Sequence, residues 1–219
     1  MALDFFNALD DAASLYILGD LFEYWIGDDA GLPIYQDAIA ALASLSAAGC
    51  TVTVMLGNRD FLLGDAFAAA TGARLICDDE LLIDVHGKPV LLLHGDTLCI
   101  DDTAYQEFRM QVRKHEWQAQ FLAKSVDERI AIATRLREQS RSSSAGKTSE
   151  LMDVNLAEVQ ARLAVHHCQT LIHGHTHRPA DHFDHSSGTR RLVVGDWQPT
   201  QAQYVLSNDK GLSLETWTA

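Results

Sequence analysis

Three alternating histidines follow a short apolar run in the last quarter of the chain. His173, His175 and His177 lie within TLIHGHTHRP, residues 170–179. Neutral imidazole is a common metal ligand, and imidazole also titrates close to neutral pH. The stretch alone therefore leaves three roles open: a metal site, a pH-sensitive switch, or a set of structural histidines.

Four apolar runs along the chain end in the same way, with glycine next to a polar residue. The runs are LYILGD, VTVMLGNRD, PVLLLHGD and TLIHGHTH, and they deliver Asp20, Asn58, His94 and His175, with His177 two residues further on. Short apolar runs bounded by glycine predict buried strands. Sites in open α/β sheets lie beyond the carboxyl ends of the strands, so we expect these side chains to meet.

The ligand types at these strand ends indicate a divalent metal ion. Carboxylate, amide oxygen and imidazole, without sulfur, suit Mn²⁺, Fe²⁺ or Zn²⁺. A carboxylate has two oxygens and can bridge two ions, and two ions about 3.5–4 Å apart are the usual clamp for phosphoester hydrolysis. A lone histidine is more often structural, and that is the interpretation we favour for His173, which ends its strand.

The segments between these strands predict an α/β fold. Helices are expected over about Ile34–Ala48 and from about Gly64 to Ala70, and strands alternating with helices favour this fold class. The late runs RRLVVGDW and AQYVLSN predict two more strands. We expect a single domain over residues 1–219.

The segment from Thr103 to Val165 has a different pattern, with almost no strand signal. Its apolar residues recur at helical spacing and predict two or more helices, inserted before the histidine strand. The Ser-rich stretch Gln139–Ser149 predicts a loop within it. One apolar stripe, with Leu122 beside it, either packs on the core or lines a chamber for acyl chains; its members are Trp117, Phe121, Val126 and Ile130.

Composition places the chain among soluble globular proteins. It has 219 residues, of which 47% are hydrophobic and 21% charged. The apolar runs stay below the ~18 residues of a membrane span, and no secretory signal pattern opens the chain. The four cysteines form no C-x-x-C pair, which favours free thiols in a reducing cytosol.

Charge is unevenly distributed along the chain. The formal net charge is −13, which argues against general nucleic-acid binding. Between Glu107 and Lys147, however, nine basic residues accompany five acidic ones. This segment is either a solvated helix with i,i+4 pairs or a surface for an anionic ligand or membrane. No sequence feature indicates a protein partner.

Four motifs resemble those of the calcineurin-like metallophosphoesterases. They are GDLFEYWIGDD, GNRDFLLG, HGDTLCIDD and HGHTHRP. The resemblance runs from about Leu15 to the C-terminus. It implies an αββα sandwich with a helical cap at residues 103–165. Within the superfamily, the chain resembles the branch that hydrolyses UDP-2,3-diacylglucosamine to UMP and 2,3-diacylglucosamine 1-phosphate in lipid A biosynthesis. The motifs that carry this resemblance are LFEYWIGDD, GNRDFLL, HGDTLCIDD and LMDVN. For that branch we expect two Mn²⁺ ions and a cytoplasmic enzyme, peripheral on the inner membrane of a Gram-negative bacterium.

The resemblance also implies a role for individual residues. Asp20 would bridge two metals, Asn58, His94 and His175 would complete one site, and His177 would join the other. Asn58 and His175 would also stabilise charge in the transition state. The matching substrate-binding positions are Asn58, Arg59, Asp102, Ser140, Ser144, Lys147 and His175.

One family motif has no counterpart in the sequence. The superfamily has an opening strand ending in Asp-x-His, whereas this chain begins MALDFFNALDDAASLYILGD, which resembles the helix that follows that strand. One metal site then has only Asp20 and His177. We favour a start codon placed too late, because every later motif is intact. The alternatives are a truncated homologue with little or no activity and a metallophosphoesterase acting on a soluble nucleotide.

Overall fold

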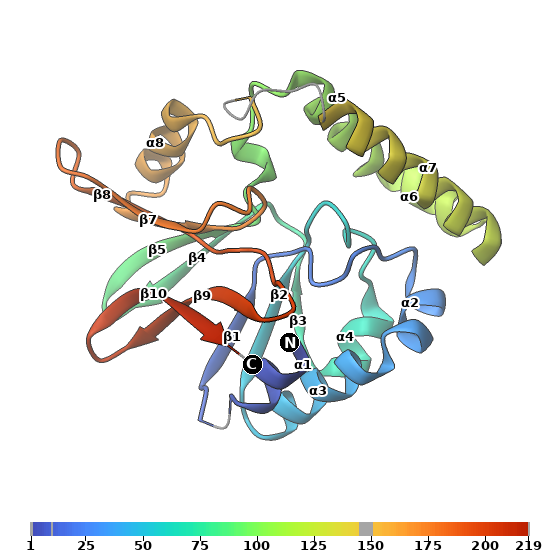
Figure 1. The fold of residues 1–219 in the computed structure, drawn as a ribbon, viewed down its shortest axis with the longest axis horizontal. Helices are drawn as coiled ribbons and strands as arrows, with labels where there is room; N and C mark the ends of the chain where they lie inside the picture. The colour runs from blue at the N-terminus through green and yellow to red at the C-terminus, as the bar shows by residue number, and fades with distance from the viewer. Residues whose placement is uncertain (1, 10, 145–150, 219) are drawn as a thin grey trace.

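Two β-sheets pack face to face in the structure, a computed structural model that describes residues 2–9, 11–144 and 151–218 (Figure 1). The smaller sheet is parallel, with the order β1 (Ser14–Ile17), β2 (Thr51–Met55), β3 (Arg74–Ile76). The larger sheet is mixed, with the order β4 (Glu80–Val85), β5 (Lys88–Leu93), β6 (Thr170–His173), β8 (Thr189–Val193), β7 (Ala180–Asp184). A separate antiparallel hairpin consists of β9 (Gln201–Asn208) and β10 (Gly211–Thr218).

The core between the two sheets consists of aliphatic side chains from both. Met55 and Ile76 of the smaller sheet pack against residues of the larger one, Val90, Leu92, Ile172 and Leu192. Strands β2 and β5 are buried along most of their length, which explains their continuous apolar sequences.

Helices cover the outer face of each sheet and complete an αββα sandwich (Figure 1). The smaller sheet is covered by α1 (Ala2–Asn7), α2 (Asp28–Ile34), α3 (Gln36–Ala47) and α4 (Asp65–Thr71). On the larger sheet, Val159 and Leu163 of α8 (Leu156–Val165) pack against Leu91, Leu93 and Leu171. The expected fold class is confirmed, as are the helices predicted near α3 and α4.

Three further helices lie together above one end of the sheets (Figure 1). They are α5 (Thr103–Val112), α6 (His115–Leu122) and α7 (Val126–Ser144), preceded by a short 3-10 helix at Asp96–Leu98. Arg129 of α7 is buried and donates to the Ile26 carbonyl at 2.5 Å and to Asp29 Oδ1 at 2.8 Å. These bonds fix α7 over the loop that follows β1. No described helix is both long and apolar enough to cross a membrane.

One prediction for this segment needs correction. The loop predicted at Gln139–Ser149 is wrong for its first part, because α7 continues to Ser144; residues 145–150 lie outside the described part. Serine is only mildly unfavourable in a helix, and no glycine or proline interrupts the sequence before Gly146. The strands β3, β4, β7 and β10 had no sequence prediction.

Strand β1 has one open edge. Among the described residues it pairs only with β2, and its other edge faces a cavity of about 1950 Å³. Residues 204–207 of β9 and residues 194–197 line the same cavity across from β1. The cavity extends from this edge past Asp20 to the underside of α6 and α7, so it joins the open sheet edge to the candidate site.

Candidate metal centre

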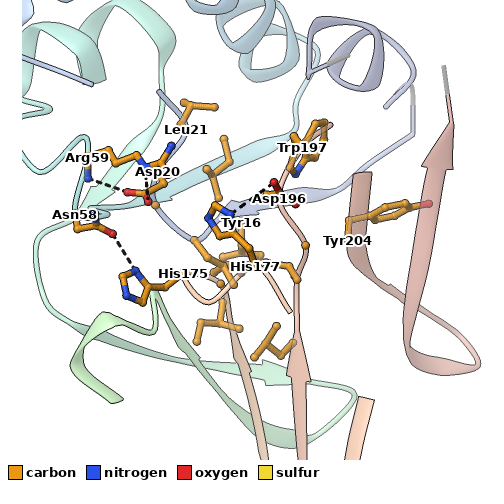
Figure 2. Close-up of a pocket in the computed structure, with 18 of the residues that line it drawn as sticks. Tyr16, Asp20, Leu21, Asn58, Arg59, His175, His177, Asp196, Trp197 and Tyr204 are labelled. Atoms are coloured by element: carbon orange, nitrogen blue, oxygen red, sulfur yellow. Dashed lines mark hydrogen bonds and ion pairs between the residues drawn. The ribbon is translucent and has the colours of Figure 1, made fainter. Parts of the chain in front are cut away.

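The four predicted strand-end residues meet at one point of the structure. Asp20 follows β1, Asn58 follows β2, His94 follows β5 and His175 follows β6. One ligand atom each from Asp20, His94 and His175 lies within 4.8 Å of the others. Figure 2 shows Asp20, Asn58 and His175 grouped at the edge of the cavity. The prediction that these loops converge is confirmed.

The backbone of these loops is unusually constrained. Asp20, His175 and His177 all have positive φ, at 54°, 64° and 54°. Such conformations cost energy for residues other than glycine and concentrate at functional sites. At Gly19 a Cβ atom would lie 2.5 Å from the Gly57 Cα atom, so only glycine allows the turns after β1 and β2 to approach this closely.

The amide oxygen of Asn58 lies at the centre of the group. Its Oδ1 atom is 2.9 Å from His94 Nε2 and 2.9 Å from His175 Nδ1. The other nitrogen of His94, Nδ1, is 2.7 Å from the Leu18 carbonyl, to which it must donate its hydrogen. In the neutral ring, Nε2 then presents a lone pair toward the oxygens of Asn58 and Asp20.

The convergence of these oxygen and nitrogen atoms fits a bound cation. Ligands about 2.1 Å from one ion, at near right angles, lie about 3 Å from each other, close to the spacing around Asn58 Oδ1. Burial lowers the pKa of His175 to about 4, helped by the proximity of His94, so the ring is neutral and able to bind metal near pH 7. The donor set of carboxylate, amide and two imidazoles thus fits a divalent ion of the first transition row.

A buried carboxylate that the sequence analysis missed joins two of these loops. Asp60 accepts backbone N–H groups from Asp20 at 3.1 Å, from Leu21 at 2.7 Å and from Gly57 at 2.9 Å. Burial and the nearby Asp20 charge raise the pKa of Asp60 above its ordinary value, while the backbone donors oppose that shift. Its place two residues after Asn58 was the only available signal, and an acid there also fits an exposed loop.

Arg59 lies next to the site and links it to α7. Its backbone N–H donates to Asp20 Oδ1 at 2.8 Å, and its Nε atom is 3.5 Å from Asp20 Oδ2 (Figure 2). Its guanidinium also donates to Glu23 at 3.0 Å, and Glu23 accepts from Arg137 at 2.7 Å. Two guanidinium groups therefore share one exposed carboxylate at the mouth of the cavity.

His177 stands apart from the other predicted ligands. Its Nδ1 atom is 3.6 Å from Asp196 Oδ2, and both side chains are exposed on the wall of the same cavity (Figure 2). Within the described residues, one group of three or more potential metal ligands forms, and it does not include His177. The structure thus assembles one of the two expected sites more fully than the other.

The other predicted substrate-binding positions within the described residues lie at the start of α5 and near the end of α7. Asp102 is the N-cap of α5, where its side chain accepts the Tyr105 N–H at 3.2 Å, and it lines the cavity together with Ser140. Ser144 is the last residue of α7, and Lys147 lies outside the described residues.

Aromatic side chains form the part of the cavity under α6 and α7. Trp117 and Phe121 stack with ring centroids 5.1 Å apart, and Phe61 packs against Trp117 at 6.1 Å. All three line the cavity, as does Leu136 of α7. Val126 and Ile130, the rest of the predicted stripe, and Leu122 beside it are exposed and do not line the cavity.

His173 is a structural histidine, in agreement with the sequence interpretation. It is fully buried, with Nδ1 2.9 Å from the Gly174 carbonyl and Nε2 3.0 Å from Arg191 Nη1. Because Arg191 can only donate, Nε2 accepts and Nδ1 donates, which uses both ring nitrogens. Burial lowers the pKa of His173 to about 3, so the ring stays neutral.

Known proteins resemble this chain along most of its length. Residues 2–179 match the calcineurin-like phosphoesterase family. A protein named UDP-2,3-diacylglucosamine hydrolase from Chromobacterium violaceum is 49% identical over 91% of this chain and 83% of its own length. A protein of the same name from Chromohalobacter salexigens is 47% identical over 90% of this chain and 81% of its own length. Another, from Cellvibrio japonicus, is 45% identical over 93% of this chain and 85% of its own length. The chain belongs to the calcineurin-like phosphoesterase family.

Proposed function

We propose that this protein hydrolyses the pyrophosphate bond of UDP-2,3-diacylglucosamine, giving UMP and 2,3-diacylglucosamine 1-phosphate in lipid A biosynthesis. The main support is the convergence of Asp20, Asn58, His94 and His175 beside a cavity with an aromatic wall. Such a site offers metal ligands for the diphosphate and an apolar surface for the acyl chains. The names of relatives 45–49% identical to the chain agree with this assignment.

The ligand set assigns the metal-binding residues. Asp20, Asn58, His94 and His175 would bind one Mn²⁺ ion, and Asp20 with His177 would form part of a second site. Asp196 lies 3.6 Å from His177, but among the described residues His177 belongs to no group of three or more potential ligands, and the family's Asp-x-His strand would provide two further ligands. When bound, the ions supply an activated water and neutralise charge on the phosphate oxygens.

The chain's own residues would position the diphosphate and stabilise developing charge. Arg59 and Arg137 both bind Glu23 in the free protein and are placed to exchange this exposed carboxylate for phosphate oxygens. Asn58 and His175 lie where negative charge develops as water attacks phosphorus and the phosphoanhydride bond breaks. Asp102, Ser140, Ser144 and Lys147 are proposed to contact the remainder of the substrate.

Helices α5, α6 and α7 of the 103–165 segment would act as a helical cap inserted in a single domain, whereas α8 at the end of the segment packs on the larger sheet. The aromatic wall of Trp117 and Phe121 would bind acyl chains, and each buried methylene contributes ~0.8 kcal/mol. The basic residues of this segment would attract an anionic bilayer, making the enzyme peripheral on the cytoplasmic face of the inner membrane. Flotation with anionic vesicles checks this: association should weaken as salt rises, and salt-independent association would contradict it.

Substrate preference tests the assignment. For this we define the strand-added form, in which the chain is extended at its N-terminus by one β-strand ending in Asp-x-His. Burying only four methylenes contributes about 3 kcal/mol, so UDP-2,3-diacylglucosamine should be preferred to UDP-N-acetylglucosamine by more than about 100-fold in kcat/KM. Equal turnover of the two would contradict the proposal and favour a soluble nucleotide substrate.

A further inference from the structure

The loop that contains Asn58 is bonded from outside the sandwich. Arg113 lies directly after α5, and its Nη2 atom donates to the Leu56 carbonyl at 3.2 Å and to the Gly57 carbonyl at 3.0 Å. These are the two carbonyls immediately before Asn58. One side chain from the 103–165 segment therefore contacts the backbone that positions a proposed metal ligand.

A second contact from the same segment reaches the other side of this loop. The Arg113 guanidinium carbon lies 5.3 Å from the centre of the Phe61 ring, within the range of a cation–π contact. Phe61 also packs against Trp117 of α6. The loop from Leu56 to Phe61 is thus fixed on both sides of Asn58 by residues of the 103–165 segment.

The hydrogen bonds of Arg113 to these carbonyls come from a charged donor, which makes them strong enough to hold the Leu56–Gly57 backbone in place. The side chain is half-buried, and burial lowers its pKa, but a guanidinium stays charged in proteins. Its Nη2 atom donates to the two backbone carbonyls, and hydrogen bonds from a charged donor are stronger than those between neutral groups. Loss of this donor would leave two carbonyls to find other partners.

The loop has little freedom to absorb such a loss. A Cβ atom at Gly57 would lie 2.2 Å from the Asp20 nitrogen, so the Gly57 backbone already packs directly on the turn that contains Asp20. A shift of the Leu56–Gly57 peptide would therefore change the distance between Asn58 and Asp20.

We infer that Arg113 is a positioning residue for Asn58, which makes the geometry of the metal site depend on the seating of the 103–165 segment. The inference rests on the proposed role of Asn58 as a metal ligand. Arg113 would touch neither metal nor substrate; it would act through the Leu56 and Gly57 carbonyls.

The test compares Mn²⁺ dissociation constants, measured by electron paramagnetic resonance of free Mn²⁺, in chains whose folding is checked by circular dichroism. Arg113→Met keeps the length of the side chain without its donors and should bind Mn²⁺ about tenfold more weakly. Arg113→Lys keeps charge and one donor group and should fall between. Arg135→Met makes the same change at an exposed position of α7 and should leave the affinity unchanged.

The outcomes separate this inference from the proposed function. Wild-type Mn²⁺ affinity in Arg113→Met, with weakened affinity in Asn58→Ala, overturns the positioning role alone. Wild-type affinity in both variants overturns the metal site as well. If Arg113→Met does not fold, Arg113→Lys decides, and wild-type affinity there overturns the inference. In the strand-added form, Arg113→Met should lower kcat more than it raises KM, since a misplaced ligand affects the chemical step.

Discussion

The chain is expected to bind one Mn²⁺ ion tightly and a second only weakly. Four protein ligands bind structural Zn²⁺ with about 10–16 kcal/mol, or about 3 kcal/mol per ligand. Two ligands, Asp20 and His177, would then supply about 5–8 kcal/mol, a dissociation constant of roughly 1–200 µM. Mn²⁺ binds such ligands more weakly than Zn²⁺, so about 0.1–1 mM is expected for the second ion.

Supplying an Asp and a His from an added strand should turn the second site into a tight one. In the strand-added form, an extra Asp and His contribute about 6 kcal/mol, which tightens the second ion by about 10⁴-fold. Restoring a two-metal clamp should also raise turnover by orders of magnitude, since each 1.4 kcal/mol of transition-state stabilisation is tenfold in rate.

Titration with Mn²⁺, monitored by electron paramagnetic resonance of the free ion, measures both forms directly. Below about 10 µM free Mn²⁺ the chain should bind one equivalent and the strand-added form two. His177→Ala should remove the weak equivalent from the chain and leave the tight one. Two tight equivalents in the chain, or full activity without the added strand, would show that this ligand count is wrong.

Three further predictions concern single side chains. His94→Ala removes one of four ligands and should weaken the tight Mn²⁺ by about 100-fold, whereas the exposed His115→Ala should not; equal affinities would refute the assigned ligands. Leu136→Asp, on the cavity wall, should raise KM for the diacylated substrate at least about tenfold, while the exposed Leu122→Asp should not; matching KM values would exclude this wall as the acyl site. His173→Phe removes the acceptor of the Arg191 guanidinium and one of two donors to the Gly174 carbonyl, which still accepts the Thr176 N–H, and should cost about 1–3 kcal/mol in urea unfolding, so an unchanged midpoint would contradict its structural role.

The strand-end residues could be predicted because two local signals coincide there. Each of the four strands comes from a short apolar run, although β1 is more exposed than predicted, and at each strand end a glycine lies next to a residue able to bind metal, as at Gly19-Asp20 and His94-Gly95. The topology of parallel strands then brings the carboxyl ends of those runs together.

Other features depend on contacts between distant segments, which a local pattern does not contain. Asp60 is an acid in a loop sequence, and only the fold surrounds it with backbone donors from two strand ends. Helical spacing put Val126 in one stripe with Phe121, but α6 and α7 are separate helices, and only Phe121 faces the cavity. In the sequence, Arg113 is one of several charges in a basic segment. Its hydrogen bonds to two carbonyls more than 50 residues away depend on the fold.

Release of UMP from UDP-2,3-diacylglucosamine is the most direct measurement of the central claim, that the strand-end residues form a metal centre for pyrophosphate hydrolysis. The strand-added form should release UMP and 2,3-diacylglucosamine 1-phosphate in proportion to bound Mn²⁺. His94→Ala in that form should lose this release at micromolar Mn²⁺, while His115→Ala retains it. No release at saturating Mn²⁺, or equal release from His94→Ala, would contradict the claim.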